Sequence, residues 1–160
     1  MKNIVIFFVL CLFVACQWKS KGQETLPAFD LLLKDSVTHF NTSAINSGSP
    51  IVLMYFSPDC EHCQKETEGI IQNMDSLKHV RFYLVTNDPI ERMQVYDKMY
   101  KLDKYPNIIL GRDYKYFFPV HFKNAAPPYL VVYDRHKVIK AVFTGETSAG
   151  QLIAFIKTLS

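Results

Sequence analysis

The sequence predicts an α/β domain in which helices flank a central β-sheet. Apolar runs of strand length alternate along the chain with segments whose apolar residues recur at helical spacing. Apolar residues make up 49% of the chain and aromatic residues 14%, which is ample for a core. Residues 28–160 match the size of one compact domain and contain no repeat or low-complexity segment. Strands and helices that alternate in this way typically build an α/β layout.

Five segments have the composition of strands. Residues 51–56 form a continuous apolar run, which suits a strand covered on both faces at the centre of a sheet. The last two strands lie on either side of a turn at 134–137. The predicted strands are residues 29–33, 51–56, 81–86, 129–133 and 138–143.

Three helices are predicted between and after these strands. The first spans 60–77, the second begins at the Asn87-Asp88-Pro89 segment, and the third follows Ser148, whose side chain is a good helix cap. Earlier in the chain, Thr42 or Ser43 is expected to cap one short turn before a loop at 46–50. The residues expected to face the core from the second helix are Met93, Tyr96, Met99 and Tyr100.

The Cys60-Glu61-His62-Cys63 segment stands where the central strand gives way to the first helix. Residues three apart on a helix share one face, so the two thiols can form and open a disulfide. A thiolate at a helix N-terminus is stabilised by unpaired N–H groups and by the helix dipole. We therefore predict a redox-active pair in which Cys60 is the nucleophile and Cys63 the less exposed resolving thiol.

The residues around Cys60 have opposing effects on its reactivity. Asp59 and Glu61 should oppose formation of a thiolate, whereas His62 should favour it when protonated. These three residues are predicted to tune the reduction potential, but their signs conflict. The direction of electron flow therefore stays open at this point.

A C-x-x-C motif has two other common uses in proteins. It is half of a zinc site, but the chain has no second C-x-x-C and no spaced histidine pair to complete one. A structural disulfide across four residues would close a very short loop and remove little entropy from the unfolded chain. We therefore expect no metal and no cofactor.

The N-terminus predicts export from the cytoplasm. Residues 1–15 have a charged start at Lys2 and an apolar stretch too short for a stable membrane span. The segment 13–16 resembles a bacterial lipobox, with Cys16 as the lipidated residue and 16–27 as a tether. Ordinary cleavage or an uncleaved anchor are the alternatives. The domain at 28–160 is thus expected to be lipid-anchored to a bacterial membrane, facing the periplasm.

Charge and cysteine content limit the partners. The net charge of +3 is spread out, and no basic cluster is interleaved with aromatics, so no nucleic acid is expected. Without the signal peptide and the lipidated Cys16, the remaining cysteines are those of the motif. Glutathione does not keep thiols reduced outside the cytoplasm, so the pair requires a membrane or periplasmic electron donor or acceptor.

From residue 29 to 159 the chain resembles the TlpA/ResA-like thiol-disulfide oxidoreductases. The resemblance rests on the strand, C-x-x-C and helix unit and on Pro128 directly before the strand at 129–133. It implies a thioredoxin-like three-layer fold with a central mixed β-sheet, and protein thiols or disulfides as substrates. It also implies that Pro128 is a cis proline and that Ala126 and Pro127, which lead into it, help to bind the substrate chain.

Glu66 is a further residue that the resemblance singles out. In ResA-like proteins a glutamate three residues after the second cysteine lies near the thiols, where a carboxylate can carry protons for Cys63. The alternative is a solvated helix charge. The chain departs from the thioredoxin pattern at Met54, where thioredoxins have a buried aspartate, and at Asp59, where a tryptophan is usual.

Two other functions remain open. Cys60, Cys63 and His121 would suit copper in a Sco-like chaperone, although those proteins carry a C-x-x-x-C motif. Ser57 stands where peroxiredoxins have a threonine or serine, which raises a thiol peroxidase. The aromatic and partly basic stretch 103–125 is interpreted either as a partner surface or as packing against the sheet.

Overall fold

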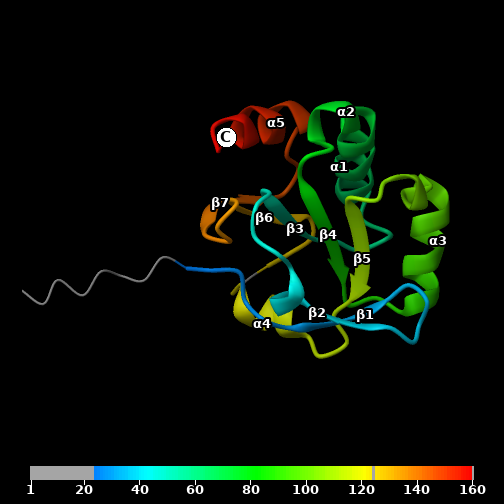
Figure 1. Ribbon diagram of the computed structural model, residues 1–160. Coiled ribbons are helices and arrows are strands. Elements are labelled where there is room, and N and C mark those ends of the chain that lie inside the picture. The colour runs from blue at the N-terminus through cyan, green and yellow to red at the C-terminus, as the bar shows by residue number, and fades with distance from the viewer. Residues whose placement is uncertain (1–23, 124, 160) are drawn as a thin grey trace, which may run out of the picture.

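A computed structural model describes residues 24–123 and 125–159 (Figure 1). The predicted signal peptide 1–15, the lipidated Cys16 and most of the tether lie outside the described residues. Seven strands form one sheet in the order β2-β1-β5-β4-β3-β6-β7. Their bounds are β1 Asp30–Leu33, β2 His39–Asn41, β3 Ile51–Tyr55, β4 Arg81–Thr86, β5 Ile108–Arg112, β6 Tyr129–Tyr133 and β7 Ile139–Thr144.

The sheet is mixed, as predicted. β3, β4 and β5 run parallel, while β6 is antiparallel to β3 and β7 is antiparallel to β6. On the other side β1 pairs antiparallel with β5, and β2 pairs antiparallel with β1 and forms the edge. In the β3–β6 register Tyr55 lies opposite Tyr129. The start of β6 therefore meets the end of β3, which leads into the cysteine motif.

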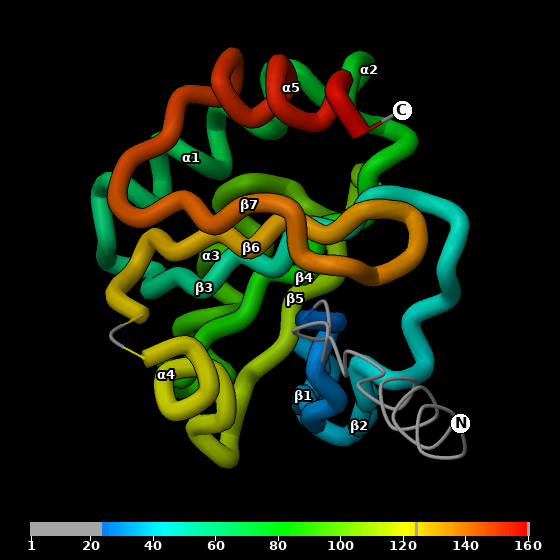
Figure 2. The backbone as a smooth tube through the Cα atoms, turned by 90° about the vertical axis from the view of Figure 1, so that its left-hand side faces the viewer, coloured from blue at the N-terminus to red at the C-terminus, as the bar shows by residue number. Residues whose placement is uncertain are grey.

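Helices cover both faces of the sheet and give three layers (Figure 2). The four helices α1 Glu61–Gln72, α2 Met74–Leu77, α3 Ile90–Tyr100 and α5 Ala149–Lys157 contribute to one buried cluster. Helix α4 Phe117–His121 packs into the cluster on the other face through Phe118. Within residues 24–123 and 125–159 the remaining elements are two 3-10 turns, η2 Thr42–Ala44 and η3 Leu102–Lys104. The three-layer α/β prediction is confirmed.

The prediction of one continuous helix over 60–77 is wrong. The segment breaks at Asn73 and forms two helices, α1 and α2. The Asn73 side-chain amide donates to the carbonyl of Gly69 at 2.9 Å, so it competes with the backbone for that acceptor. Met99, predicted to face inward from α3, is 60% exposed, whereas Met93 and Tyr96 are buried as expected.

The prediction omitted two strands. β2 has three residues, and β5 lies within the aromatic stretch 103–125, where it forms part of the sheet. The β5 residue Gly111 permits a close approach of β1, because a Cβ there would lie 2.8 Å from the Cβ of Leu31. Phe118 and Phe122 of the same stretch are buried. Packing against the sheet therefore accounts for much of this segment.

Smaller features mostly agree with the prediction. Ser148 caps α5 by accepting the Gln151 N–H at 3.2 Å. The cap of η2 is Asn41 rather than Thr42 or Ser43. The backbone N–H of Leu26 donates to the Lys137 carbonyl at 2.9 Å, which holds the end of the predicted tether against the β6–β7 turn. Within 24–123 and 125–159, no helix has the length and apolarity needed to cross a membrane.

Candidate redox site

Cys60 lies at the N-terminus of α1, at the end of the loop that follows β3. Its own N–H donates to the Ser57 carbonyl at 3.1 Å, which closes this loop. Its sulfur caps the helix by accepting the Cys63 N–H at 3.2 Å. The Gln64 amide donates to the Pro58 carbonyl at 2.8 Å and braces the loop from the first turn of the helix. Cys60, the predicted nucleophile, is thus held in place by backbone and helix contacts.

The two thiols differ in exposure. Both are free, Cys60 is half-buried and Cys63 is fully buried. Burial raises the pKa of the Cys63 thiol, and the hydrogen bond with the Cys60 sulfur raises it further. An accessible first thiol and a buried, neutral second thiol are the arrangement that the predicted roles require.

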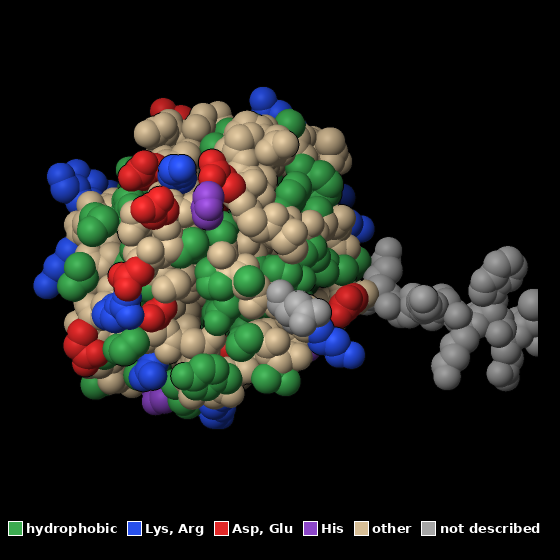
Figure 3. Space-filling model, turned by 180° about the vertical axis from the view of Figure 1, so that it is seen from behind, with side chains coloured by type: hydrophobic (Ala, Val, Ile, Leu, Met, Phe, Trp, Pro, Cys, Tyr) green, Lys and Arg blue, Asp and Glu red, His purple; other side chains and the backbone are tan. Residues whose placement is uncertain are grey.

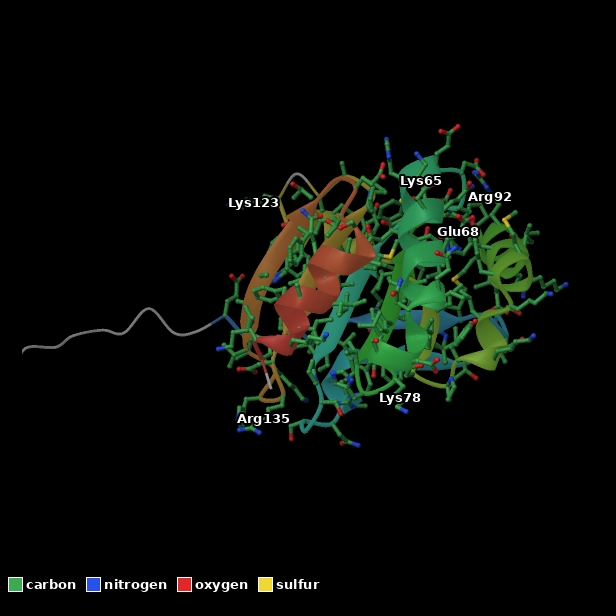
Figure 4. All side chains as sticks on the ribbon, turned by 90° about the horizontal axis from the view of Figure 1, so that it is seen from above. Lys65, Glu68, Lys78, Arg92, Lys123 and Arg135 are labelled. Atoms are coloured by element: carbon green, nitrogen blue, oxygen red, sulfur yellow. The ribbon has the colours of Figure 1, made fainter. Side chains whose placement is uncertain are left out.

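Opposite charges accompany the residues around Cys60. Asp59 forms an ion pair with Arg92 of α3, and Arg92 also contacts Asp88 at 3.2 Å. His62 Nδ1 lies 2.6 Å from a carboxylate oxygen of Glu146, in the loop before α5. Figure 4 shows Arg92 on the same side of the molecule as the first turns of α1. Contacts from other elements therefore offset the charges of Asp59 and His62, two of the three residues whose effects conflict in the sequence.

Glu66 is buried beside the motif rather than solvated. Only 2% of the residue is exposed, so the interpretation as a solvated helix charge is wrong. Oε2 accepts the Thr147 N–H at 3.0 Å, and Oε1 is buried with no hydrogen-bond partner among the described residues. Burial raises the pKa of Glu66 to about 7, although the Thr147 N–H lowers it and Glu146 raises it slightly. This carboxyl can hold or release a proton near neutral pH.

Tyr96 of α3 connects the helix that carries the motif to the neighbouring helix. Its hydroxyl donates to the Cys63 carbonyl at 3.1 Å and lies 2.7 Å from the Thr67 hydroxyl. The ring packs on Phe56, with 4.7 Å between the ring centroids. Sequence reasoning identified Tyr96 only as a core residue. Helical spacing gave no signal for its contact with the backbone of α1.

Pro128 stands where the resemblance places it. The Pro127–Pro128 peptide bond is cis, and Pro128 directly precedes the residue of β6 that pairs with Tyr55. Pro128 is buried, Pro127 is half-buried and Ala126 is exposed. The Pro128 carbonyl accepts the Gly145 N–H at 3.0 Å. The proline segment therefore lies at the end of the sheet where β3 leads into the cysteine motif.

His121, the predicted third copper ligand, ends α4. Its ring stacks on Phe117 at 5.0 Å and meets Phe122 edge-on at 4.7 Å. Among the described residues, no three histidine, cysteine, aspartate or glutamate side chains group closely enough to hold a metal ion. The structure thus does not bring His121 together with Cys60 and Cys63 as a ligand set.

The sheet and its covering helices form a thioredoxin-like fold, with the cysteine pair at the start of α1. No protein-family model matches the chain, and no curated protein matches it. Similar solved structures include a secreted Mycobacterium tuberculosis disulfide oxidoreductase homologous to Escherichia coli DsbE. It is 19% identical with a TM-score of 0.68, and the match covers 82% of this chain and 96% of that one.

Two further structures show how widely the fold is shared. Peroxidoxin BcpB from Mycobacterium tuberculosis is 16% identical with a TM-score of 0.71, and the match covers 86% of this chain and 97% of that one. A thioredoxin-like protein from Porphyromonas gingivalis is 22% identical with a TM-score of 0.65, over 84% and 90% of the chains. At these identities the likeness defines the fold, and the function must be argued from the site.

Proposed function

We propose that this protein is a membrane-anchored thiol-disulfide oxidoreductase that exchanges disulfides with cysteines of extracytoplasmic proteins. The observation that carries the proposal is the pairing of an accessible Cys60 at a helix N-terminus with a buried Cys63 one turn away. The solved disulfide oxidoreductase named above has the same fold. No bound group is needed, because the two sulfurs hold the two electrons.

Reduction of a partner disulfide proceeds in two exchanges. The Cys60 thiolate attacks one partner sulfur, forming a mixed disulfide and releasing the other partner sulfur as a thiolate. Cys63 then loses its proton and attacks the Cys60 sulfur. The Cys60–Cys63 disulfide forms, the second partner thiolate leaves, and the partner has gained two electrons. A membrane or periplasmic electron donor reduces the pair again, and the reverse sequence oxidises a partner.

Glu66 is the proposed base for the second exchange. Burial holds Cys63 as a neutral thiol, so a nearby group must take its proton before it can attack. Glu66 follows Cys63 by three residues on the same helix, and its pKa of about 7 lets it accept a proton near neutral pH. Oε1 has no partner among the described residues and can receive that proton.

The partner chain is proposed to bind along Ala126, Pro127 and Pro128. In the register of β6 against β3, this segment lies at the end of the sheet where β3 leads into the cysteine motif. The exposed Ala126 offers backbone groups to an extended partner chain. Asp59, Glu61 and His62 then act as tuning residues, with the effects of Asp59 and His62 moderated by Arg92 and Glu146.

Anchoring through Cys16 is supported by the sequence and by the place where the chain joins the domain. Leu26, the residue held by Lys137, comes ten positions after Cys16 in the sequence. A tether of that length spans at most about 35 Å. A lipid on Cys16 would therefore keep the domain close to the membrane, on its extracytoplasmic side. Radiolabelled palmitate incorporation that is lost in Cys16→Ala would test this anchor.

Trapping of the mixed disulfide tests the assigned cysteine roles. Cys63→Ser removes the thiol that resolves the mixed disulfide, so covalent complexes with partner proteins should accumulate on non-reducing gels. Cys60→Ser removes the nucleophile, and the buried Cys63 should form few complexes. Equal trapping by both variants would contradict the assignment.

A thiol peroxidase is the second candidate, favoured by the likeness to peroxidoxin BcpB. Arg92 supplies a cation near the motif, but its guanidinium is paired with Asp59 and Asp88. Peroxide consumption driven by a thiol reductant separates the two functions. Turnover of hydrogen peroxide faster than that of a protein disulfide would favour the peroxidase.

A further inference from the structure

We propose that a groove between the active-site loop and α3 binds an apolar side chain of the partner protein, close to the partner's reactive cysteine. The proposal rests on the proposed function and deepens it, because it names a feature of the partner. The occupant is a basic segment of the partner protein that carries an apolar residue near its cysteine.

The groove begins one residue from the nucleophile. One wall is formed by Pro58, Asp59 and Gln64, and the other by Val95, Tyr96 and Met99 of α3. It encloses about 300 Å³, which is room for a large aliphatic or aromatic side chain. A partner sulfur bonded to Cys60 lies next to Asp59, so a residue two or three positions along an extended partner chain is within reach.

Two exposed side chains make one wall of the groove apolar. Val95 and Met99 are each 60% exposed and lie one turn apart on α3. Met93 and Tyr96 of the same helix are buried, so the outward pair makes little contribution to the core. Methionine adapts readily to different apolar surfaces, which suits a site that accepts more than one partner.

The walls are held in place by contacts already described. Arg92 bridges the two walls through its ion pair with Asp59, and the Gln64 amide binds the Pro58 carbonyl at 2.8 Å. Tyr96 is anchored to the Cys63 carbonyl at 3.1 Å. A groove with fixed walls loses little freedom when a partner enters, which favours binding.

The charge of the rim selects the partner. Two carboxylates, from Asp59 and Glu91, line the groove beside the single guanidinium of Arg92, so the rim carries a net charge of −1. Asp88, next to the groove, pairs with the same guanidinium at 3.2 Å and adds to its neutralisation. Figure 3 shows acidic and basic side chains bordering apolar ones on the face opposite to that of Figure 1. A partner segment with lysine or arginine beside its apolar residue would complement this rim.

The test uses two synthetic peptides, each with one cysteine linked to thionitrobenzoate as the leaving thiolate. One peptide has leucine two residues before the cysteine and lysine beside that leucine, and the other has serine and aspartate at those positions. Attack of Cys60 on the peptide sulfur releases thionitrobenzoate, and the initial rate is read from its absorbance. We expect the reduced full-length protein to prefer the leucine–lysine peptide by about tenfold.

Substitution of the groove should abolish that preference. In the double variant Val95→Ser, Met99→Ser, the two peptide rates should agree within about twofold, while Val37→Ser, an exposed valine in the turn between β1 and β2, should keep the preference. Unchanged urea midpoints confirm that the variants are folded. Equal rates in the parent protein, or a preference that survives in the double variant, would overturn the proposal.

Two other outcomes are distinguishable from these. If sedimentation shows a dimer of the parent that dissociates in the double variant, the groove binds a second copy of the chain and the proposal is wrong. If neither peptide leaves a Cys60–Cys63 disulfide detectable by mass spectrometry, the proposed oxidoreductase function fails instead, and with it the groove's role.

Discussion

Replacing Glu66 with glutamine should remove the cost of ionising a buried carboxyl from the free energy of unfolding. The pKa of Glu66 rises from its ordinary 4.5 to about 7. At about 1.4 kcal/mol per pKa unit, ionising this carboxyl costs about 3 kcal/mol more in the folded protein than in the unfolded chain. Glutamine keeps the shape, and its amide oxygen can accept the Thr147 N–H that Oε2 accepts now.

Because the pKa of Glu66 is raised by folding, the parent protein should lose stability as the pH increases. Below about pH 4.5 Glu66 is neutral in both states and costs nothing. Between pH 4.5 and about 7 the unfolded chain loses the proton while the folded protein keeps it, so the parent loses stability as the pH rises. Above about pH 7 the full cost is present. The advantage of Glu66→Gln should therefore grow from near zero at about pH 4 to about 3 kcal/mol at about pH 8.

Urea unfolding of the fully reduced proteins, measured between these two pH values, gives the difference directly. Glu68→Gln is the matched control, because it removes an exposed carboxylate from the same helix. Its effect should stay within about 0.5 kcal/mol. A difference between the Glu66 variant and the parent that does not change with pH would refute the assignment of a buried, protonated carboxyl. The variant should also resolve mixed disulfides more slowly, because it cannot accept the Cys63 proton.

Two further outcomes follow from the packing around α1. Iodoacetamide should alkylate Cys60 at least about tenfold faster than Cys63 in the reduced protein, because burial hides Cys63 and keeps its thiol protonated. Peptide mapping by mass spectrometry measures both rates, and similar rates would contradict the assigned exposure. Tyr96→Phe should lower the free energy of unfolding by about 1–2 kcal/mol, because the Cys63 carbonyl and the Thr67 hydroxyl lose a partner. An unchanged urea midpoint would show that these hydrogen bonds contribute nothing.

The central strands could be predicted from the sequence because they are covered on both faces. Strand β3 and strand β6 are apolar throughout, and their bounds agree with the predicted segments to within one residue. Strand β5 combines Gly111 and Arg112 with three aliphatic residues, so its pattern alone did not separate it from a loop. Its place in the sheet depends on pairing with β4 and β1, which are distant in sequence.

Residue spacing alone predicted the site only where it is local, whereas Pro128, distant in sequence, was predicted from the family resemblance. The three-residue spacings from Cys60 to Cys63 and from Cys63 to Glu66 belong to one helix, and helical geometry places them on one face. The partners that set their environment come from elsewhere. Arg92 and Tyr96 are on α3, while Glu146 and Thr147 precede α5. Nothing in the local sequence indicates these contacts.

These distant partners change which physical effect distinguishes the reactivity of the two thiols. The sequence suggested that charges next to Cys60 compete to set its reactivity, but Arg92 pairs with Asp59 and Glu146 pairs with His62. What then separates the two thiols is mainly burial, because Cys63 and Glu66 are both enclosed on the inner face of α1. Two negative charges on that face would each raise the cost of the other. In the proposed mechanism, transfer of the Cys63 proton to Glu66 would move one charge instead of creating a second, so the resolving step would proceed without two buried anions.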